Sequence, residues 1–594
     1  MVVPSPKLPD MDRRAALVLL TVLGTGVFLA GLELMITAVA LPAIVADLGA
    51  WTELRHASWI INAYLLVYVG TMPLAGRLAD LWGVRRLFLG ALVFFSVGSL
   101  LAGSAATMDG LIAGRVVQAL GGGALVPVAT AAASHLYEGH ARPRALGIIG
   151  ALTFLGMAAG PFLGAAILGA FRPEVALERL GILGGPITGV VAPAWRWVFY
   201  VNVPIGIAAL ALAWAATAGW DTPRVRARLD VAGAALFTFA AAAILLGITL
   251  LGESGGTGET LGLDPTVLSI GLIVLGVASG TAAVVHGLRR PDPFLDPRLF
   301  GDRIFSSAAL VSLLTGYGFA TAIVGAAVFV DRVLYGGPDQ QRVALGALAG
   351  ATAVGALASG WLIRHVSLRA VSLVGLAASI GGLAWMGTWT ADVHLATVAA
   401  GGGLFGLGFG LTVTPRSTAA VEAVGRHRFG AASATVTVAR MIGMAVGLAV
   451  LTAYGSTAIS RLSAQVYASP DAYRSIVPAT LAARPLRDPL VVDALESWAA
   501  RKAAETMVVL FLVAAGVTAV AVPAALALGE RPRMLSPETG ARALGGAGGQ
   551  DGGDAADGAD RPDGDDPGRP GRDDPARPDG DDPDDRERGD VGLV

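Results

Sequence analysis

Residues 76–86 read GRLADLWGVRR and stand between two long apolar runs of the chain. Glycine allows a tight turn at such a connection, and Asp80 can face the start of a helix or an arginine of a neighbouring helix. A fainter copy lies 284 residues further on, where Gly360, Leu362, Arg364, Ser367 and Arg369 take the places of Gly76, Leu78, Asp80, Gly83 and Arg85. The recurrence predicts two related halves.

Apolar runs long enough to cross a membrane occupy most of the chain. The 594 residues are 54% hydrophobic and 15% charged, whereas about a quarter of the residues in soluble proteins are charged. A spanning helix needs about 20 apolar residues. Fourteen such runs occur, at 15–41, 57–76, 87–108, 110–134, 145–170, 197–219, 231–252, 266–288, 304–330, 343–363, 370–391, 395–415, 429–460 and 504–529. We therefore expect an all-α membrane protein with fourteen transmembrane helices and a retained first helix.

The distribution of basic residues predicts the orientation. With the N-terminus inside, the inner connections hold 23 Arg and Lys residues and the outer connections hold 12. Because basic residues favour the cytoplasmic side, both termini should be cytoplasmic. Residues 551–594 carry 16 acidic residues and 6 Arg among Gly and Pro. We therefore expect residues 531–594 to form a disordered acidic cytoplasmic tail.

Two motifs carry a resemblance to a known family. The connection at 76–86 resembles the signature loop of the major facilitator superfamily, and glycines of the fifth span resemble the antiporter motif of its exporters. The residues of these conformational motifs are Gly76, Asp80, Gly83, Arg85 and Arg86, followed by Gly156, Gly160, Pro161 and Gly164. Small residues three or four apart provide a smooth face for close helix packing. The resemblance implies the major facilitator fold, with two pseudo-symmetric six-helix bundles.

Three further segments are similar to the fourteen-span drug:proton antiporter branch of that superfamily. They read LELMITAVALP at 32–42, WIINAYLL at 59–66 and WRWVFYVNVPIG at 195–206. In this branch a pair of helices is inserted between the bundles. The implied organisation is an N-terminal six-helix bundle at 1–220, the inserted pair at 221–303, a C-terminal six-helix bundle at 304–530 and the tail.

Glu33 and Arg115 are charged residues inside predicted spans, and their positions place them at similar depth. An ionisable side chain in a membrane is costly and is therefore a functional candidate. Family resemblance assigns proton coupling to both positions, with Glu33 where the branch usually has Asp. Burial disfavours a carboxylate and a nearby arginine favours it, so a carboxyl group with alternating surroundings could carry a proton across. The alternative is a fixed ion pair that joins two helices.

Arg440 is a third charge within a predicted span, about 16 Å deep at 1.5 Å per residue. It could attract an anionic cargo headgroup or pair with Glu33 in one state, and the alternative is bonding to backbone carbonyl groups. Further candidates for polar contacts in a cargo cavity are Gln118, Asn62, Tyr64 and Tyr317. Each of these four could equally be a packing residue.

The predicted outer loop at 461–503 is long. Residues 489–507 have apolar side chains at helical spacing and lead without a breaker into the last span, which predicts a helix that projects about 25 Å beyond the membrane. With residues 438–455 and 72–77, this region resembles actinobacterial-type exporters of triacylglycerides and related lipids, which deliver towards a periplasmic carrier. The alternative is a tolerated surface insertion.

The sequence thus predicts a proton-coupled secondary active exporter, an antiporter of amphiphilic or lipophilic compounds of the multidrug-efflux type that works by alternating access. The first alternative is an exporter of neutral lipids or glycolipids to the periplasmic side, and a proton-coupled importer is a weaker one. The chain has no phosphate-binding loop for ATP and no intramembrane hydrolase pattern. We therefore expect no enzyme activity, no catalytic residues, no metal and no cofactor, with the proton gradient as energy source.

The expected partners follow from the same interpretation. They are membrane lipids, small amphiphilic molecules or lipids as cargo, and a periplasmic lipid carrier, without nucleic acid. We expect a monomer in the cell membrane of a bacterium. The absence of cysteine excludes disulfides and thiolate chemistry.

Overall fold

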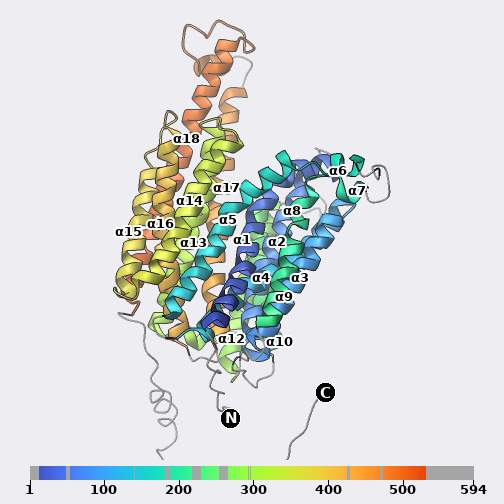
Figure 1. Ribbon diagram of the computed structural model, residues 1–594. Helices are drawn as coiled ribbons and strands as arrows, with labels where there is room; N and C mark the ends of the chain where they lie inside the picture. Colours follow the sequence, from blue (N-terminus) through green and yellow to red (C-terminus); the bar gives the residue numbers. More distant parts are fainter. Residues whose placement is uncertain are drawn as a thin grey trace, which may run out of the picture. The chain divides into compact units, whose positions relative to one another are not determined.

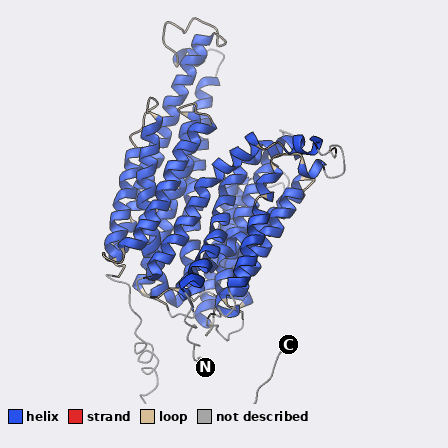
Figure 2. Ribbon diagram, viewed as in Figure 1, coloured by secondary structure: helices blue, strands red, loops and turns tan. Residues whose placement is uncertain are grey.

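The computed structural model describes residues 13–48, 54–138, 141–179, 181, 188–216, 222, 229–252, 265–291, 293–294, 296–424, 428–467 and 472–529. In these residues the secondary structure is helical throughout, without a strand (Figure 2). Fourteen of the described helices are long and apolar enough to cross a membrane, which confirms the predicted all-α membrane protein. The predicted tail, 531–594, lies outside the described residues.

The first half of the chain supplies six long helices (Figure 1). They are α1 (Arg13–Leu48), α2 (Leu54–Trp82), α3 (Val84–Ser104), α4 (Met108–Leu136), α5 (Ala141–Ala170) and α9 (Asn202–Ala216). The short helices α6 (Pro173–Arg179), α7 (Thr188–Val191) and α8 (Arg196–Tyr200) connect α5 to α9. We call the end at which α1 begins and α2 ends the inner end, and the opposite end the outer end.

The rest of the chain supplies the two helices that were predicted to be an inserted pair, and the helices of the second half. The pair consists of α10 (Val231–Gly252) and α12 (Pro265–Arg289). The second half contains η2 (Pro297–Gly301), α13 (Arg303–Arg332), α14 (Pro338–Leu362), α15 (Leu368–Met386), α16 (Leu395–Glu422), α17 (Phe429–Tyr467), η4 (Ala472–Ser475), α18 (Pro489–Ala519) and α19 (Ala521–Leu526).

Local sequence signals explain where several helices begin. Gly83 separates α2 from α3 with a φ of 89°, a left-handed conformation that glycine adopts without strain. Side-chain oxygens cap the first turns of other helices, with Thr107 before α4, Asp302 before α13 and Asp488 before α18. Such caps satisfy amide groups that have no partner inside the helix.

Several helices continue past the predicted spans, and the difference changes the position of a charged residue in the twelfth. The twelfth span was expected to end at residue 415, but α16 continues through Pro415 to Glu422. Proline removes one amide donor and strains the preceding turn, yet helices in membranes tolerate it because their surroundings satisfy the freed groups. As a result Arg416, which the prediction placed in an inner connection, lies inside the helix and is only 1% exposed.

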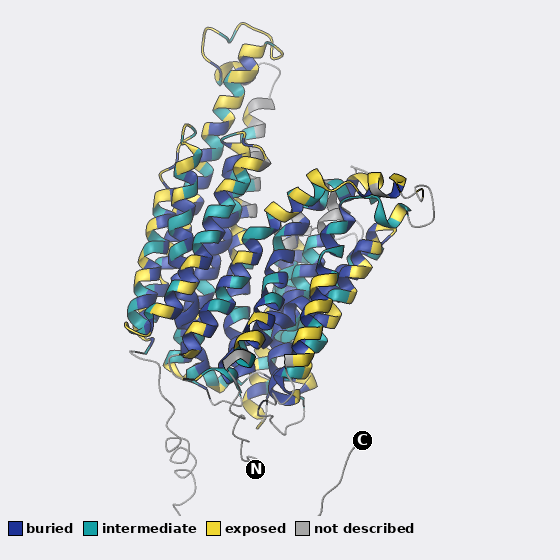
Figure 3. Ribbon diagram, in the orientation of Figure 1, coloured by how far each residue is buried: buried dark blue, intermediate teal, exposed yellow. Residues whose placement is uncertain are grey.

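Burial separates the helices that form the core from those that surround it. In Figure 3 the exposed residues follow the outward faces of the helices. Of the most apolar stretch in α4, 78% is buried, compared with 17% in α12. The α4 helix therefore lies inside the first half, whereas α12 keeps an apolar exposed surface suited to lipid.

The outer ends of α17 and α18 project beyond the other helices (Figure 1). As predicted for residues 489–507, α18 begins at Pro489 and continues into the last span. In the segment that connects the two helices, Tyr473 and Val477 form a small buried cluster with Val491 of α18. The hydroxyl group of Tyr473 donates a hydrogen bond of 2.6 Å to the carbonyl oxygen of Arg484. This outer segment therefore has a small core of its own.

Candidate functional site

Glu33 on α1 and Arg115 on α4 form an ion pair in the interior of the first half. Glu33 is 0% exposed and Arg115 is 1% exposed. The guanidinium Nη1 donates to Oε1 of Glu33. Sequence positions alone predicted similar depth for the two residues, and the structure brings them into contact. Their predicted role in proton coupling is a separate statement that the contact does not test.

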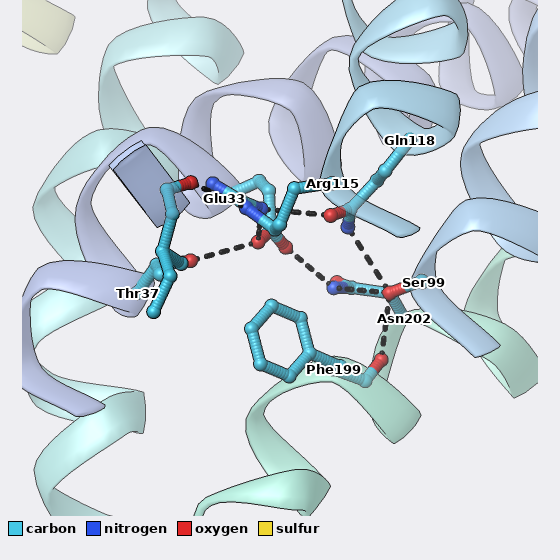
Figure 4. Close-up of polar contacts among 8 residues, drawn as sticks. Glu33, Thr37, Ser99, Arg115, Gln118, Phe199 and Asn202 are labelled. Atoms are coloured by element: carbon cyan, nitrogen blue, oxygen red, sulfur yellow. Dashed lines mark hydrogen bonds and ion pairs between the residues drawn. The ribbon is translucent and has the colours of Figure 1, made fainter. Parts of the chain in front are cut away.

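Both oxygens of Glu33 accept further hydrogen bonds (Figure 4). The hydroxyl group of Thr37, one turn further along α1, donates to Oε1 over 2.9 Å. The amide Nδ2 of Asn202, the first residue of α9, donates to Oε2 over 2.7 Å. A buried carboxylate is costly unless it is paired and hydrogen-bonded, and these contacts supply that compensation.

A second set of bonds holds the guanidinium of Arg115. Its Nη1 donates to Oε1 of Gln118 over 2.7 Å, and its Nε donates to the carbonyl oxygen of Ile60 over 3.2 Å. Gln118 in turn donates to the hydroxyl of Ser99 over 3.1 Å, and Asn202 donates to the same hydroxyl over 3.2 Å. The network thus joins α1, α2, α3, α4 and α9.

Sequence reasoning found only part of this network. Gln118 was predicted as a cavity residue, and it lies beside the ion pair. Asn202 and Ser99 were not singled out, although Asn202 belongs to the segment at 195–206 that resembles the antiporter branch. A small polar side chain in a span gives no signal of its partner, because the partner is more than a hundred residues away.

Two tyrosines of α2 extend the site towards the second half. Arg115 stacks on the ring of Tyr64, with 3.9 Å from the guanidinium carbon to the ring centre. Tyr64 stacks in turn on Tyr68, with ring centres 5.5 Å apart. Both rings are buried, and neither hydroxyl has a hydrogen-bond partner among the described residues. A buried hydroxyl group without a partner is costly. A ligand that supplied the missing hydrogen bonds would therefore be stabilised here.

The other predicted cavity residues lie elsewhere. Arg440 is buried on α17, and its Nε has no hydrogen-bond partner among the described residues. Tyr317 lies on α13 and packs its main chain against Gly447 of α17. Asn62 is half-buried on α2.

The motif at 76–86 joins the two halves at the inner end. Asp80 on α2 accepts hydrogen bonds from the first amides of α17, 2.9 Å from Gly430 and 3.0 Å from Ala431. The carboxylate thus occupies the positive end of a helix of the opposite half. Close approach requires Gly76, because a Cβ there would lie 2.5 Å from the carbonyl oxygen of Gly430. Arg85 is half-buried and Arg86 is exposed at the start of α3.

Glycines of the fifth span hold α5 against α1. A Cβ on Gly160 would lie 2.8 Å from the Cβ of Met35, and one on Gly164 would lie 3.2 Å from a side-chain carbon of α1. A Cβ on Gly156 would collide with a main-chain oxygen of α1. Pro161 lies within the continuous helix α5. The small-residue face predicted from the motif is therefore buried in a helix contact.

The inner end contains further contacts between the halves. Phe429 at the start of α17 packs against His135 of α4, with ring centres 5.0 Å apart, and Arg142 of α5 lies over the same ring at 5.2 Å. Gly147 of α5 faces Gly360 of α14, where a Cβ would lie 3.2 Å from the opposite Cα. In this structure the two halves are packed together at the inner end.

The described residues contain no cluster of three or more His, Cys, Asp or Glu side chains that could hold a metal ion. The buried polar residues instead form the ion-pair network and the contacts between halves. Such an arrangement can hold a charge, move helices relative to one another and bind a molecule between them.

Comparison with known proteins gives a consistent result. The family model described as Major Facilitator Superfamily matches residues 23–448. The chain is 33% identical over 447 residues to a triacylglyceride transporter of Mycolicibacterium hassiacum, covering 73% of this chain and 78% of that protein. It is 34% identical over 434 residues to the cephamycin export protein CmcT of Amycolatopsis lactamdurans, covering 72% and 82%.

A solved structure has the same fold. The human organic anion transporter MFSD10 matches 85% of this chain and 99% of its own, with a TM-score of 0.55 and 15% identity. At this identity the likeness concerns the fold alone. The predicted family and fold class are confirmed, and the relatives are transporters rather than enzymes. The chain is therefore an integral membrane transporter that belongs to the major facilitator superfamily.

Proposed function

We propose that this transporter is a proton-coupled exporter, an antiporter of amphiphilic or lipophilic compounds that works by alternating access. The observation that carries the proposal is the fully buried carboxyl group of Glu33, paired with Arg115 between two helices of the first half. Related proteins are named as an export protein and a triacylglyceride transporter, which supports outward movement of cargo.

Protonation of Glu33 would change the contacts of several helices at once. The charged carboxylate accepts bonds from α1, α4 and α9, and a neutral carboxyl group loses most of its attraction for Arg115. Removing one partner of a buried ion pair costs about 3–5 kcal/mol when the other charge stays uncompensated. A proton on Glu33 therefore favours a rearrangement in which Arg115 finds another partner.

The contacts between the two halves at the inner end are the part of the structure that would open or close when Glu33 gains or loses its proton. Asp80 and the start of α17 hold the halves together there, and the outward direction of release requires that this end opens and closes once per cycle. In the proposal, cargo binds from the inside or from the membrane, and entry of a proton from outside resets the cycle. Basic residues concentrate in the predicted inner connections, which supports a cytoplasmic inner end.

Export of neutral lipids or glycolipids is the second candidate function. It is favoured by the outer segment of α17 and α18, which has its own buried cluster and projects beyond the other helices (Figure 1). Delivery of an apolar molecule across a watery space needs a covered route or a carrier, because exposed apolar surface is costly in water. Shortening the segment 461–503 should abolish lipid export and leave export of a soluble dye intact.

The coupling proposal is tested in proteoliposomes with an imposed proton gradient, a fluorescent amphiphilic dye and a labelled neutral lipid. Wild type is compared with Glu33→Gln and with Glu174→Gln, a matched control on an exposed residue of α6. We expect gradient-driven export in wild type and in the control, and none in Glu33→Gln. Normal gradient-driven transport by Glu33→Gln would show that Glu33 is structural and that the proton mechanism is wrong. The cargo that wild type transports better decides between the two candidate functions.

A further inference from the structure

Two buried arginines in the second half have no acidic partner among the described residues. Arg416 on α16 is 1% exposed and Arg440 on α17 is 9% exposed. Arg416 donates to the hydroxyl of Thr315 over 2.5 Å. The Nε of Arg440 has no hydrogen-bond partner in the part of the chain that the structure describes. Both charges are therefore buried without the compensation that Arg115 receives from Glu33.

The two guanidinium groups are held on neighbouring aromatic rings. Arg416 lies 5.0 Å from the ring centre of Phe409, and Arg440 lies 5.6 Å from that of Phe154. The two rings meet edge to face, with centres 5.4 Å apart. Phe154 belongs to α5 of the first half, so the cluster spans both halves. Cation–π contacts orient the guanidinium groups but leave their charge uncompensated.

The α13 helix lies close to both arginines. Thr315, which accepts the bond from Arg416, precedes Gly316, where a Cβ would lie 2.3 Å from the carbonyl oxygen of Arg440. Tyr68 lies on α2, which packs against α17, the helix that carries Arg440, and its ring is buried. The hydroxyl of Tyr68 has no partner among the described residues. The cluster therefore combines two cations with a hydroxyl donor around one place between the halves.

An anion at this place would compensate the charges. Burial of an unpaired charge is costly, and two like charges repel each other. Arginine presents a planar fork of donors that matches the oxygens of a carboxylate or phosphate. Within the chain, the carboxylate of Glu33 already accepts bonds from Arg115, Thr37 and Asn202, so it does not serve this site in the observed state.

We propose that Arg416 and Arg440, with the hydroxyl of Tyr68, bind the carboxylate or phosphate headgroup of an otherwise apolar cargo molecule. Close by, Phe319 stacks on Phe409 with ring centres 4.6 Å apart, and this aromatic surface contacts the first part of the apolar chain. The inference rests on the proposed export function for its cargo, and it selects acidic amphiphiles among the compounds considered there.

The test measures binding to the full-length protein in phosphatidylcholine nanodiscs by titration of tryptophan fluorescence. The probes are decyl phosphate, decanoate, decanol and inorganic phosphate, and decanol controls for partition of the decyl chain into lipid. Because hydrogen bonds to a charged group are stronger than those to a neutral hydroxyl, wild type should bind decyl phosphate and decanoate about tenfold or more tighter than decanol. Arg416→Gln and Arg440→Gln should each lower this preference at least several-fold, with decanol binding unchanged.

Two further variants make the result specific. Arg332→Gln removes an exposed arginine at the end of α13 and should leave the preference at its wild-type value. Arg440→Lys keeps the charge but not the planar fork, so it should restore part of the preference lost in Arg440→Gln. If Arg416→Gln does not fold, the two variants of Arg440 decide the question alone.

Equal affinity for decyl phosphate and decanol in wild type would overturn the proposal, and so would an unchanged preference in the arginine variants. Equal affinity for inorganic phosphate and decyl phosphate would show a site for free anions and overturn the assignment to an amphiphile. The binding assay requires no proton gradient. Normal transport by Glu33→Gln would refute the coupling mechanism and leave this site intact, whereas wild-type binding by the arginine variants would refute only the site.

Discussion

Replacement of Asp80 by asparagine should weaken the contact that holds the inner ends of the two halves together. In the structure each carboxylate oxygen of Asp80 accepts one amide of α17, from Gly430 at 2.9 Å and from Ala431 at 3.0 Å. Asparagine has nearly the same shape but only one acceptor oxygen and no charge. The substitution therefore removes one of two hydrogen bonds and the interaction of a negative charge with the helix start.

The size of the effect follows from these two losses. A hydrogen bond to a charged group contributes about 1.5–3 kcal/mol, and a negative charge at a helix N-terminus contributes about 0.3–1 kcal/mol. Allowing for the bond that asparagine retains, the inner contact should weaken by about 2–3 kcal/mol, which is a change of about 30- to 150-fold in the equilibrium between closed and open inner ends. Bonds inside one half are not affected.

The absence of cysteine makes a distance measurement simple, because two introduced cysteines are the only sites that a spin label can modify. Glu138→Cys and His365→Cys place labels on exposed inner-end residues of the two halves. Double electron–electron resonance measures the distance between the two spin labels. It should show a larger population of long distances when residue 80 is asparagine than when it is aspartate.

The matched control is Asp302→Asn. Asp302 accepts two backbone amides at the start of α13, both on Oδ1, at 2.8 and 3.0 Å. Its replacement therefore also removes a negative charge from a helix start, but both partners belong to the second half. This control should leave the distances between halves unchanged. The same distribution in Asp80→Asn and wild type, or an equal shift in Asp302→Asn, would refute the reasoning.

Three further predictions concern packing, pH and the outer segment. Gly160→Ala should lower stability by about 1–3 kcal/mol because the new methyl group meets α1, whereas Gly169→Ala, with open space, should not. Thermal unfolding in detergent compares the two, and equal melting temperatures would contradict the packing argument. Although burial disfavours its charge, hydrogen bonds from His286 and two amides hold the pKa of Asp230 below its ordinary value. Its contribution to stability is therefore complete above about pH 4 and is lost as the pH falls through the lowered pKa. The difference in melting temperature between wild type and Asp230→Asn should therefore decrease as the pH is lowered below about 4. A difference that stays constant over this pH range would contradict the prediction. Val491→Ala should destabilise the outer segment by on the order of 1–2 kcal/mol, and hydrogen exchange should accelerate there and nowhere else.

The sequence was sufficient to predict the features that depend on composition and spacing. The spans follow from apolar length, and the depth of Glu33 and Arg115 follows from counting residues along two spans. The glycines of the fifth span were predicted to form a packing face, and Gly160 lies against α1. These predictions succeed because a membrane imposes length and polarity on every helix that crosses it.

The features that were missed depend on how distant residues meet. Arg416 was assigned to a connection because the twelfth span was predicted to end at residue 415, but the helix continues and carries the charge into the interior. Asn202 hydrogen-bonds Glu33 from a helix start 169 residues away. Neither feature leaves a pattern in the local sequence. Whether a helix continues through a proline, and which partner a side chain finds, depend on the surrounding helices.

The complete burial of Glu33 has a consequence for the membrane in which the protein sits. With no exposed surface on its carboxyl group and all its neighbours in one tight network (Figure 4), the resting chain offers ions no continuous wet path through this point. A cell stores energy as a voltage and a pH difference across that same membrane, and a carboxyl group in contact with water on both sides at once would let protons cross without moving cargo. In the observed state the carboxyl group of Glu33 is closed off from bulk water, so a proton can reach it only when the surrounding helices move.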